Sequence, residues 1–230
     1  MFEVYHGLAH AGPRPTQRAI LRKFVWKNLK KDVLEWCKTC DNCQTSKVAK
    51  HIHTPWSKRP PPDRRFGSLH VDLVGPLPVS EGHQYLFTIV DRFSRWPEAI
   101  PLVDMTAKSC ARAFLRHWVS RFGLPSDLTS DRGRQFTSEL WKQLNDILGV
   151  KAQNTTAYHP QSNGLVERLH RQLKSSIMAR STGTDWMDQL PMVMLGIRTA
   201  WRTELGCSPA ELVYGTSLTV PGLIIGDNFD

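Results

Sequence analysis

Residues 158–174 read Y-H-P-Q-S-N-G-L-V-E-R-L-H-R-Q-L-K, and their character changes part of the way along. The first half is polar and rich in turn formers, and the second half has a helical pattern, so we expect Glu167 in the first turn of a helix. Two acids precede it: Asp72 in the apolar run L-H-V-D-L-V-G, and Asp131 in the turn-like S-D-R-G-R-Q-F. Because crowded carboxylates repel one another, three acids gathered from separate elements would indicate a site for divalent cations.

The region around these acids alternates short β-type runs with amphipathic helical patterns. Apolar residues at helical spacing predict one helix that stops at Gly123, and a second helix is expected from a cap at Ser138 to Gly149. Strands are expected at residues 69–74, 85–90, 99–103, 127–130 and 150–156. This order predicts an α/β fold with a mixed five-stranded sheet flanked by helices. If the fourth strand lies beside the first, Asp72 and Asp131 become neighbours and Glu167 can face both.

The N-terminal region carries a pattern of metal ligands. His6 and His10 are four residues apart, and after 29 intervening residues Cys40 and Cys43 form a Cys-x-x-Cys pair. Four such ligands suit a closed, tetrahedral zinc site with a structural role. Cys37-x-x-Cys40 is an alternative register, but Cys40 and Cys43 are preferred because they follow the apolar helix at a polar turn. About 50 residues with two short helices hold little core, and zinc would offset that shortage.

Charge and composition restrict the class of protein. The chain has 230 residues and a net charge of +9. Residues 1–65 hold fourteen Lys or Arg against five Asp or Glu, a surplus of nine, so the remainder is neutral. This basic front predicts a polyanionic partner, with nucleic acid the leading candidate. No apolar run is long enough for a membrane span, so no membrane partner is expected. Five cysteines, an odd number, argue against a secreted disulfide framework.

Three regions follow from these patterns. Residues 1–48 are expected to form a small all-α zinc-binding domain, residues 49–65 a basic, proline-rich linker, and residues 66–230 a catalytic core with a C-terminal helical extension. The linker could follow a phosphate backbone or simply space the two domains. In the extension, residues 185–200 show helical spacing that Pro191 would kink or delay.

These motifs together resemble the integrases of gypsy-like LTR retrotransposons, which are related to retroviral integrases. The resemblance covers nearly the whole chain and rests on the His and Cys pairs and on V-D-L-V-G-P-L-P, I-V-D-R-F-S-R-W-P-E-A, S-D-R-G-R-Q-F-T-S and H-P-Q-S-N-G-L-V-E-R. The 35 residues between Asp131 and Glu167 match the spacing of the integrase acidic triad. The resemblance implies a ribonuclease H-like core with Asp72, Asp131 and Glu167 as catalytic residues.

The resemblance also implies an activity and its cofactors. The expected function is that of a DNA integrase, an endonuclease and polynucleotidyl transferase that trims the 3′-ends of element DNA and joins them to target DNA. Two Mg²⁺ or Mn²⁺ ions per active site would be held by the three acids, since carboxylates favour these ions over zinc. Expected partners are double-stranded DNA, both element ends and target, and further copies of the chain. The expected site of action is the nucleus, after synthesis in the cytoplasm.

Further residues are assigned to DNA contact by the same resemblance. Arg171 and Lys174 follow Glu167 by four and seven residues, which places them on its helical stripe. Tyr158, Gln161 and Asn163 match the family's active-site loop.

Two other functions remain as alternatives. A domesticated integrase derivative that binds DNA or protein without integrating is the first, because no further C-terminal domain is evident in the sequence. A ribonuclease H or a cut-and-paste transposase is disfavoured by the zinc motif and by the spacing of the acids.

Overall fold

The computed structural model describes residues 1–46, 62–154, 164–181 and 184–221. By packing, the chain forms two compact units. We call His51–His170 the sheet unit, and Met1–Lys50 together with Arg171–Asp230 the zinc unit. The predicted sequence regions 1–48, 49–65 and 66–230 stay a prediction, and most of the predicted linker lies outside the described residues. Helix α9, Gly164–Arg180, begins in the sheet unit and continues into the zinc unit.

The sheet unit is built on five strands in the order β3-β2-β1-β4-β5. The strands are β1 Ser68–Val74, β2 Tyr85–Asp91, β3 Pro97–Leu102, β4 Asp127–Ser130 and β5 Lys151–Asn154. The first three pair antiparallel, whereas β4 runs parallel to both β1 and β5. The predicted mixed sheet is therefore confirmed, with the fourth strand beside the first.

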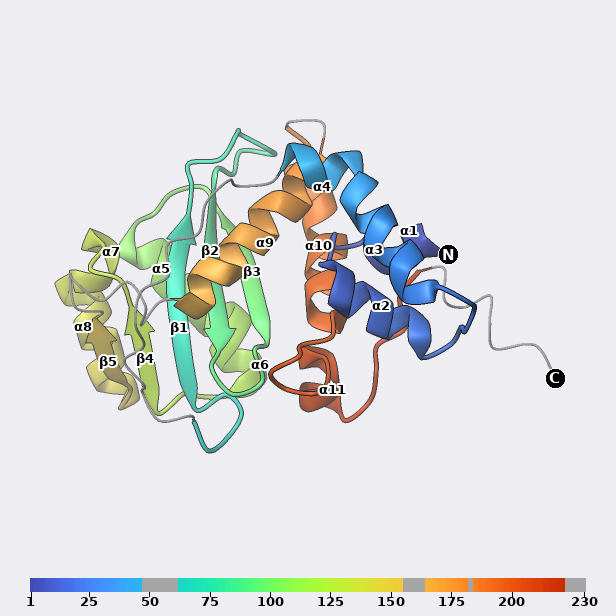
Figure 1. Ribbon diagram of the computed structural model, residues 1–230. Coiled ribbons are helices and arrows are strands. Elements are labelled where there is room, and N and C mark those ends of the chain that lie inside the picture. The colour runs from blue at the N-terminus through green and yellow to red at the C-terminus, as the bar shows by residue number, and fades with distance from the viewer. Residues whose placement is uncertain (47–61, 155–163, 182–183, 222–230) are drawn as a thin grey trace. The chain divides into compact units, whose positions relative to one another are not determined.

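The two faces of the sheet carry different side chains because successive residues of a strand point to opposite sides. Phe87 of β2 contacts Phe136 and Trp141, with ring centroids 6.2 Å and 6.3 Å away, and it pairs in register with Leu73 of β1. This face is therefore the apolar one. Asp72 pairs with Thr88 and must lie on the other face, beside which Figure 1 shows the start of α9.

The helices on the apolar face follow the expected stop and start signals. They are α5 Ala107–Ala113, η1 Phe114–Val119, α6 Ser120–Phe122, α7 Arg134–Thr137 and α8 Glu139–Leu148. Gly123, with φ of 79°, ends the first group as predicted, although its middle part η1 is a wider π-helix. The hydroxyl of Ser138 accepts a hydrogen bond from the Trp141 amide at the start of α8, and Gly149 ends that helix with φ of 68°.

The zinc unit consists of short helices. They are α1 Phe2–His6, α2 Pro13–Leu21, α3 Leu29–Thr39, α4 Asp41–Thr45, α10 Trp186–Thr199 and α11 Pro209–Tyr214, together with the end of α9. Ile20, Leu29, Val33 and Cys37 form a small buried core among the first four helices. Within the described residues, no helix combines the length and the apolar character that a bilayer crossing requires.

The C-terminal helices pack closely on the N-terminal ones. A Cβ added to Gly196 of α10 would lie 2.8 Å from the Cβ of Ala9, so only glycine allows this approach. The hydroxyl of Ser176 donates a hydrogen bond to the carbonyl of Ala9 (2.8 Å), and Arg180 donates one to the carbonyl of Gly7 (3.2 Å). Pro191 lies inside α10, which continues through it. Residues from both ends of the chain therefore build one unit.

Candidate active site and zinc centre

Four side chains of the zinc unit converge on one point. Ligand atoms of His6, His10, Cys40 and Cys43 all lie within 4.8 Å of one another. The Sγ atom of Cys43 lies 3.3 Å from His6 Nε2 and 3.4 Å from His10 Nδ1, and Cys40 Sγ lies 3.5 Å from His10 Nδ1. In a tetrahedral site with typical zinc–nitrogen and zinc–sulfur bonds, the nitrogen–sulfur separation is about 3.6 Å. The donor set and its spacing therefore fit zinc.

The tautomer of His6 follows from its hydrogen bond. His6 Nδ1 lies 3.0 Å from the carbonyl oxygen of Ala11, and a carbonyl only accepts. Nδ1 must therefore carry the proton, which leaves the lone pair on Nε2 facing the cysteines. Such a contact orients a metal-binding histidine. The Sγ atom of Cys37 lies 3.7 Å from Nδ1, the protonated side of the ring, so Cys37 is no ligand and the preferred Cys40/Cys43 register is confirmed.

Local backbone geometry and burial also suit metal binding. Helix α1 ends at His6, and His10 follows in a turn with φ of 45°, where its amide donates a hydrogen bond to the His6 carbonyl (2.7 Å). Burial lowers the pKa of His6, and it lowers the pKa of His10 to about 4, with His6 and Arg180 contributing to the second shift. Both imidazoles are therefore neutral near pH 7, as zinc ligation requires.

The first two acids of the predicted triad lie on adjacent strands. The parallel pairing of β1 with β4 sets His70 opposite Thr129. Two residues further along each strand are Asp72 and Asp131, so continuing this register brings them level and onto the same face. Adjacent strands lie about 4.8 Å apart. Asp131 directly follows β4, and its Oδ1 accepts a hydrogen bond from the Gly133 amide (2.9 Å).

The third acid stands on α9, whose first turns contact the same place. Glu167 is exposed in the first turn, as predicted. One turn later, His170 Nδ1 lies 3.9 Å from Asp72 Oδ2, and His170 Nε2 lies 2.7 Å from the hydroxyl of Thr88. The start of α9 therefore lies against the part of β1 that carries Asp72. Sequence reasoning missed His170 and Thr88; the only available signal was a histidine three residues after Glu167.

The carboxylates do not converge as tightly as the zinc ligands do. Among the described residues, His6, His10, Cys40 and Cys43 form the one group of three or more such side chains that are placed to hold a metal ion. Asp72 and Asp131 lie level on one face of adjacent strands, and Glu167 stands in the first turn of the helix that contacts this face. Carboxylates of like charge repel, and closer approach requires positive charge between them. The triad stays a prediction that the strand register supports.

Of the five residues predicted to contact DNA, two lie within the described part of the chain. Arg171 and Lys174 are exposed on α9, one and two turns beyond Glu167. Helical geometry puts the three side chains along one stripe, as the sequence suggested. Tyr158, Gln161 and Asn163 lie outside the described residues.

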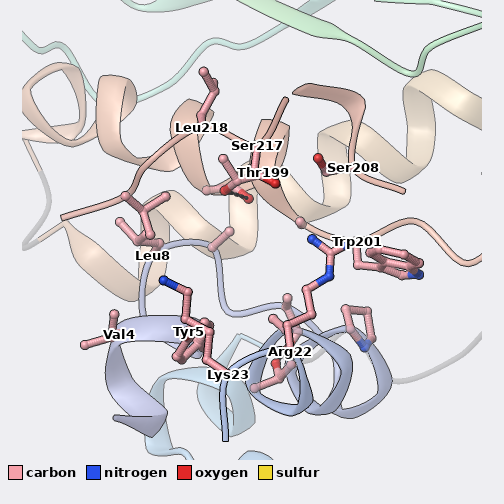
Figure 2. Close-up of a pocket in the computed structure, with 18 residues that line it drawn as sticks. Val4, Tyr5, Leu8, Arg22, Lys23, Thr199, Trp201, Ser208, Ser217 and Leu218 are labelled. Atoms are coloured by element: carbon pink, nitrogen blue, oxygen red, sulfur yellow. Dashed lines mark hydrogen bonds between the residues drawn. The ribbon is translucent and has the colours of Figure 1, made fainter. Parts of the chain in front are cut away.

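A pocket of about 220 Å³ lies in the zinc unit, and none of the three acids lines it. Its walls come from α1, α2 and the segments around α10 and α11 (Figure 2). Arg22 reaches toward Trp201 there, with its guanidinium carbon 4.2 Å from the ring centroid, and it forms an ion pair with Glu211 (3.1 Å). Burial alone would raise the pKa of Glu211, but hydrogen bonds from Ser208, Ser217 and Arg22 lower it to about 2. These contacts hold Arg22 in place by packing and ion pairing within the zinc unit.

Comparison with known proteins agrees with both sites. The integrase zinc binding domain family matches residues 1–49, which contain all four zinc ligands, and the integrase core domain family matches residues 62–160, which contain Asp72 and Asp131. The Tf2-3 and Tf2-4 transposon polyproteins of Schizosaccharomyces pombe are each 29% identical over 211 residues. That alignment covers 90% of this chain but only 16% of each polyprotein.

A solved structure shows the same fold. It is a chain in the cryo-EM structure of the simian T-cell lymphotropic virus intasome in complex with the PP2A regulatory subunit B56 gamma. The similarity has a TM-score of 0.61 at 18% identity and covers 96% of this chain and 77% of that one. The sheet is thus the ribonuclease H-like sheet of an integrase core, preceded by a helical zinc domain. The two family matches together span more than half of the residues, and the chain belongs to the retroviral-type integrases, with a zinc site formed by His6, His10, Cys40 and Cys43.

Proposed function

We propose that the chain is a DNA integrase that trims the 3′-ends of a retroelement's DNA and joins them to target DNA. The observation that carries the proposal is the parallel register of β1 and β4, which brings Asp72 level with Asp131 on the face of the sheet where α9 begins. A donor set of three carboxylates suits Mg²⁺ or Mn²⁺. Asp72, Asp131 and Glu167 would hold two such ions, which would stabilise negative charge on the attacking and leaving oxygens.

For this reaction the protein needs only to bind the DNA and the metal ions and to align the reacting groups. In trimming, the oxygen of water forms a new bond to phosphorus while the bond to the departing 3′-oxygen breaks. In joining, the new 3′-hydroxyl attacks a target phosphodiester in the same way. The leaving oxygen takes up a proton in each case, and no electrons are transferred. The carboxylates of this chain would hold the metal ions, and no covalent bond forms between the DNA and the enzyme.

The substrate class follows from charge. Residues 1–65 carry the whole surplus of nine positive charges, and Arg171 and Lys174 extend from the acidic site along α9. Basic side chains that replace counterions on phosphates supply most of the affinity for nucleic acid. We therefore propose double-stranded DNA, both the element ends and the target, as the partner. The likeness to an intasome chain supports assembly of several copies, and the nucleus is the compartment in which chromosomal target DNA is met.

The direct test is a joining assay. Purified zinc-loaded protein is incubated with Mg²⁺ and labelled duplexes that carry the terminal sequences of the encoding element. We expect shortened strands first and then longer products joined to target DNA. Retention of the duplex on the protein without either product would contradict integration and would favour a DNA-binding derivative that has lost activity.

Lys174→Ala is expected to weaken binding of the element end by removing one phosphate contact. Each neutralised phosphate contributes about 0.9 to the slope of log affinity against log salt concentration. The slope should therefore become shallower by about one unit, as measured by fluorescence anisotropy between 50 and 200 mM salt. Lys142→Ala is the matched control, since Lys142 is an exposed lysine on α8 of the sheet unit. An equal effect of both substitutions would remove Lys174 from the DNA-binding surface.

A further inference from the structure

His170 links three elements of the sheet unit at the predicted metal site. Its Nε2 lies 2.7 Å from the hydroxyl oxygen of Thr88 on β2, and its Nδ1 lies 3.9 Å from Asp72 Oδ2 on β1. The hydroxyl of Thr88 also donates a hydrogen bond to the backbone carbonyl of Asp72 (3.0 Å). Thr88 is fully buried, and the side chains of His170 and Asp72 are only 16% and 17% exposed. The helix is therefore linked through Thr88 to the main chain of Asp72, and the His170 ring lies close to the side chain of the same acid.

Counting donors determines the direction of these bonds. The carbonyl of Asp72 only accepts, so the single proton of the Thr88 hydroxyl points to it. The hydroxyl oxygen can then only accept from His170, which places a proton on Nε2. The result is a chain of donors from α9 through β2 to β1. Because Thr88 is buried, breaking either bond would leave a polar group with neither a protein partner nor water, which is unfavourable.

Packing alone does not explain why a histidine stands here. Val166 and Leu169, both buried, already supply apolar contact for this end of α9. With 3.6 residues per turn, His170 lies about 40° from Val166 and about 60° from Glu167 around the helix. It therefore stands between the buried stripe and the predicted metal ligand. A side chain in this place controls how α9 is rotated about its axis, and hence where Glu167 points.

We infer that His170, acting through Thr88, is a positioning residue that sets the rotation of α9 and thereby aligns Glu167 with Asp72 for divalent metal binding. The inference rests on the proposed function, because it requires the acids to bind metal. Residues that orient metal ligands typically contribute about 10- to 100-fold to metal affinity. His170 itself is no catalytic group in this account. Its effect reaches the metal site through its hydrogen bond to Thr88 and the bond from Thr88 to the carbonyl of Asp72.

The test measures Mn²⁺ affinity directly, by the electron paramagnetic resonance signal of free Mn²⁺, on the zinc-loaded full chain without DNA. Zinc binds nitrogen and sulfur ligands far more tightly than Mn²⁺ does, so the zinc site does not interfere. Thr88→Val and His170→Leu each remove the hydrogen bond between Thr88 and His170 while keeping an apolar side chain of similar size. Each is expected to raise the Kd for Mn²⁺ about tenfold. The double variant should be no weaker than the weaker single variant, since both act through one contact.

Conservative variants show whether the hydrogen bond, rather than the size of the side chains, determines the affinity for Mn²⁺. Thr88→Ser keeps the hydroxyl, and His170→Gln keeps a nitrogen donor near the place of Nε2, so both should stay within about threefold of the wild type. His117→Gln, an exposed histidine of the same unit, should leave the affinity unchanged. Urea unfolding of every variant identifies any that fail to fold. If His170→Leu is such a case, the comparison of Thr88→Val with Thr88→Ser carries the test.

The outcomes are distinct. An unchanged Mn²⁺ affinity in Thr88→Val and His170→Leu, or effects that multiply in the double variant, would overturn the positioning role alone. Asp72→Asn serves as the reference for the metal site. If Asp72→Asn binds Mn²⁺ as tightly as the wild type does, the proposed metal site and this inference fail together.

Discussion

Replacing Asp72 by Asn is expected to abolish trimming and joining of DNA while the sheet unit stays folded. The substitution keeps the size and shape of the side chain but removes the charge that a shared metal ligand needs. Metal ions supply several kcal/mol of stabilisation to charge in the transition state, and each 1.36 kcal/mol corresponds to a factor of ten in rate. We therefore expect a loss of about a thousandfold or more in the joining rate, measured with labelled duplex ends under single-turnover conditions.

The matched control for this variant is Asp146→Asn. Asp146 is an exposed acid on α8, a helix of the opposite, apolar face of the sheet, so its loss should leave the joining rate within about twofold of the wild type. Circular dichroism of both variants should match the wild type. Joined products from Asp72→Asn at the wild-type rate would contradict the assignment of this carboxylate, and with it the proposed mechanism.

Replacing Cys40 by Ser is expected to release zinc and unfold the N-terminal helices. A structural zinc ion contributes about 10–16 kcal/mol of binding energy, which is as large as the whole stability of a typical domain. The buried core of these helices is small, namely Ile20, Leu29, Val33 and Cys37, and it cannot replace that contribution. We expect the zinc content to fall from about one equivalent to none. Hydrogen exchange should become fast in residues 1–46 and stay slow in the strands of the sheet unit.

Cys37→Ala controls for the removal of a thiol near the same site. Cys37 lies three residues before Cys40 but faces the protonated nitrogen of His6, and it packs in the small core. It should therefore keep about one equivalent of zinc and lose only about 1 kcal/mol of stability. Both registers use Cys40, so loss of zinc from Cys37→Ala together with retention in Cys43→Ser would show that the alternative register, Cys37 with Cys40, is the correct one.

Local patterns allowed much of the fold to be predicted. The start and end of α8 could be predicted because Ser138 and Gly149 each act on nearby backbone groups of the chain. The strands were visible as short apolar runs, and the four zinc ligands were visible because metal coordination imposes residue types and spacing. By contrast, α11 was not predicted as a helix, although Ser208 and Glu211 form a capping box at its start.

Other features depended on residues far apart in the chain. Gly196 gave no sign in the sequence that Ala9 would pack against it. The pairing of Thr88 with His170 joins residues 82 positions apart, and neither belongs to a motif that suggests the other. The grouping of the C-terminal helices with the N-terminal ones likewise arises from packing between the two ends of the chain.

The stretch at residues 158–174 shows where these two kinds of information divide. The sequence alone determined that Glu167 opens a helix and that Arg171 and Lys174 share its stripe, because helical periodicity is local. Only the tertiary structure decided that this helix lies against Asp72, because that contact depends on β1 pairing with its neighbours and on His170 meeting a buried hydroxyl. Local backbone preferences define elements, whereas burial and hydrogen bonding between distant segments define the site that those elements form.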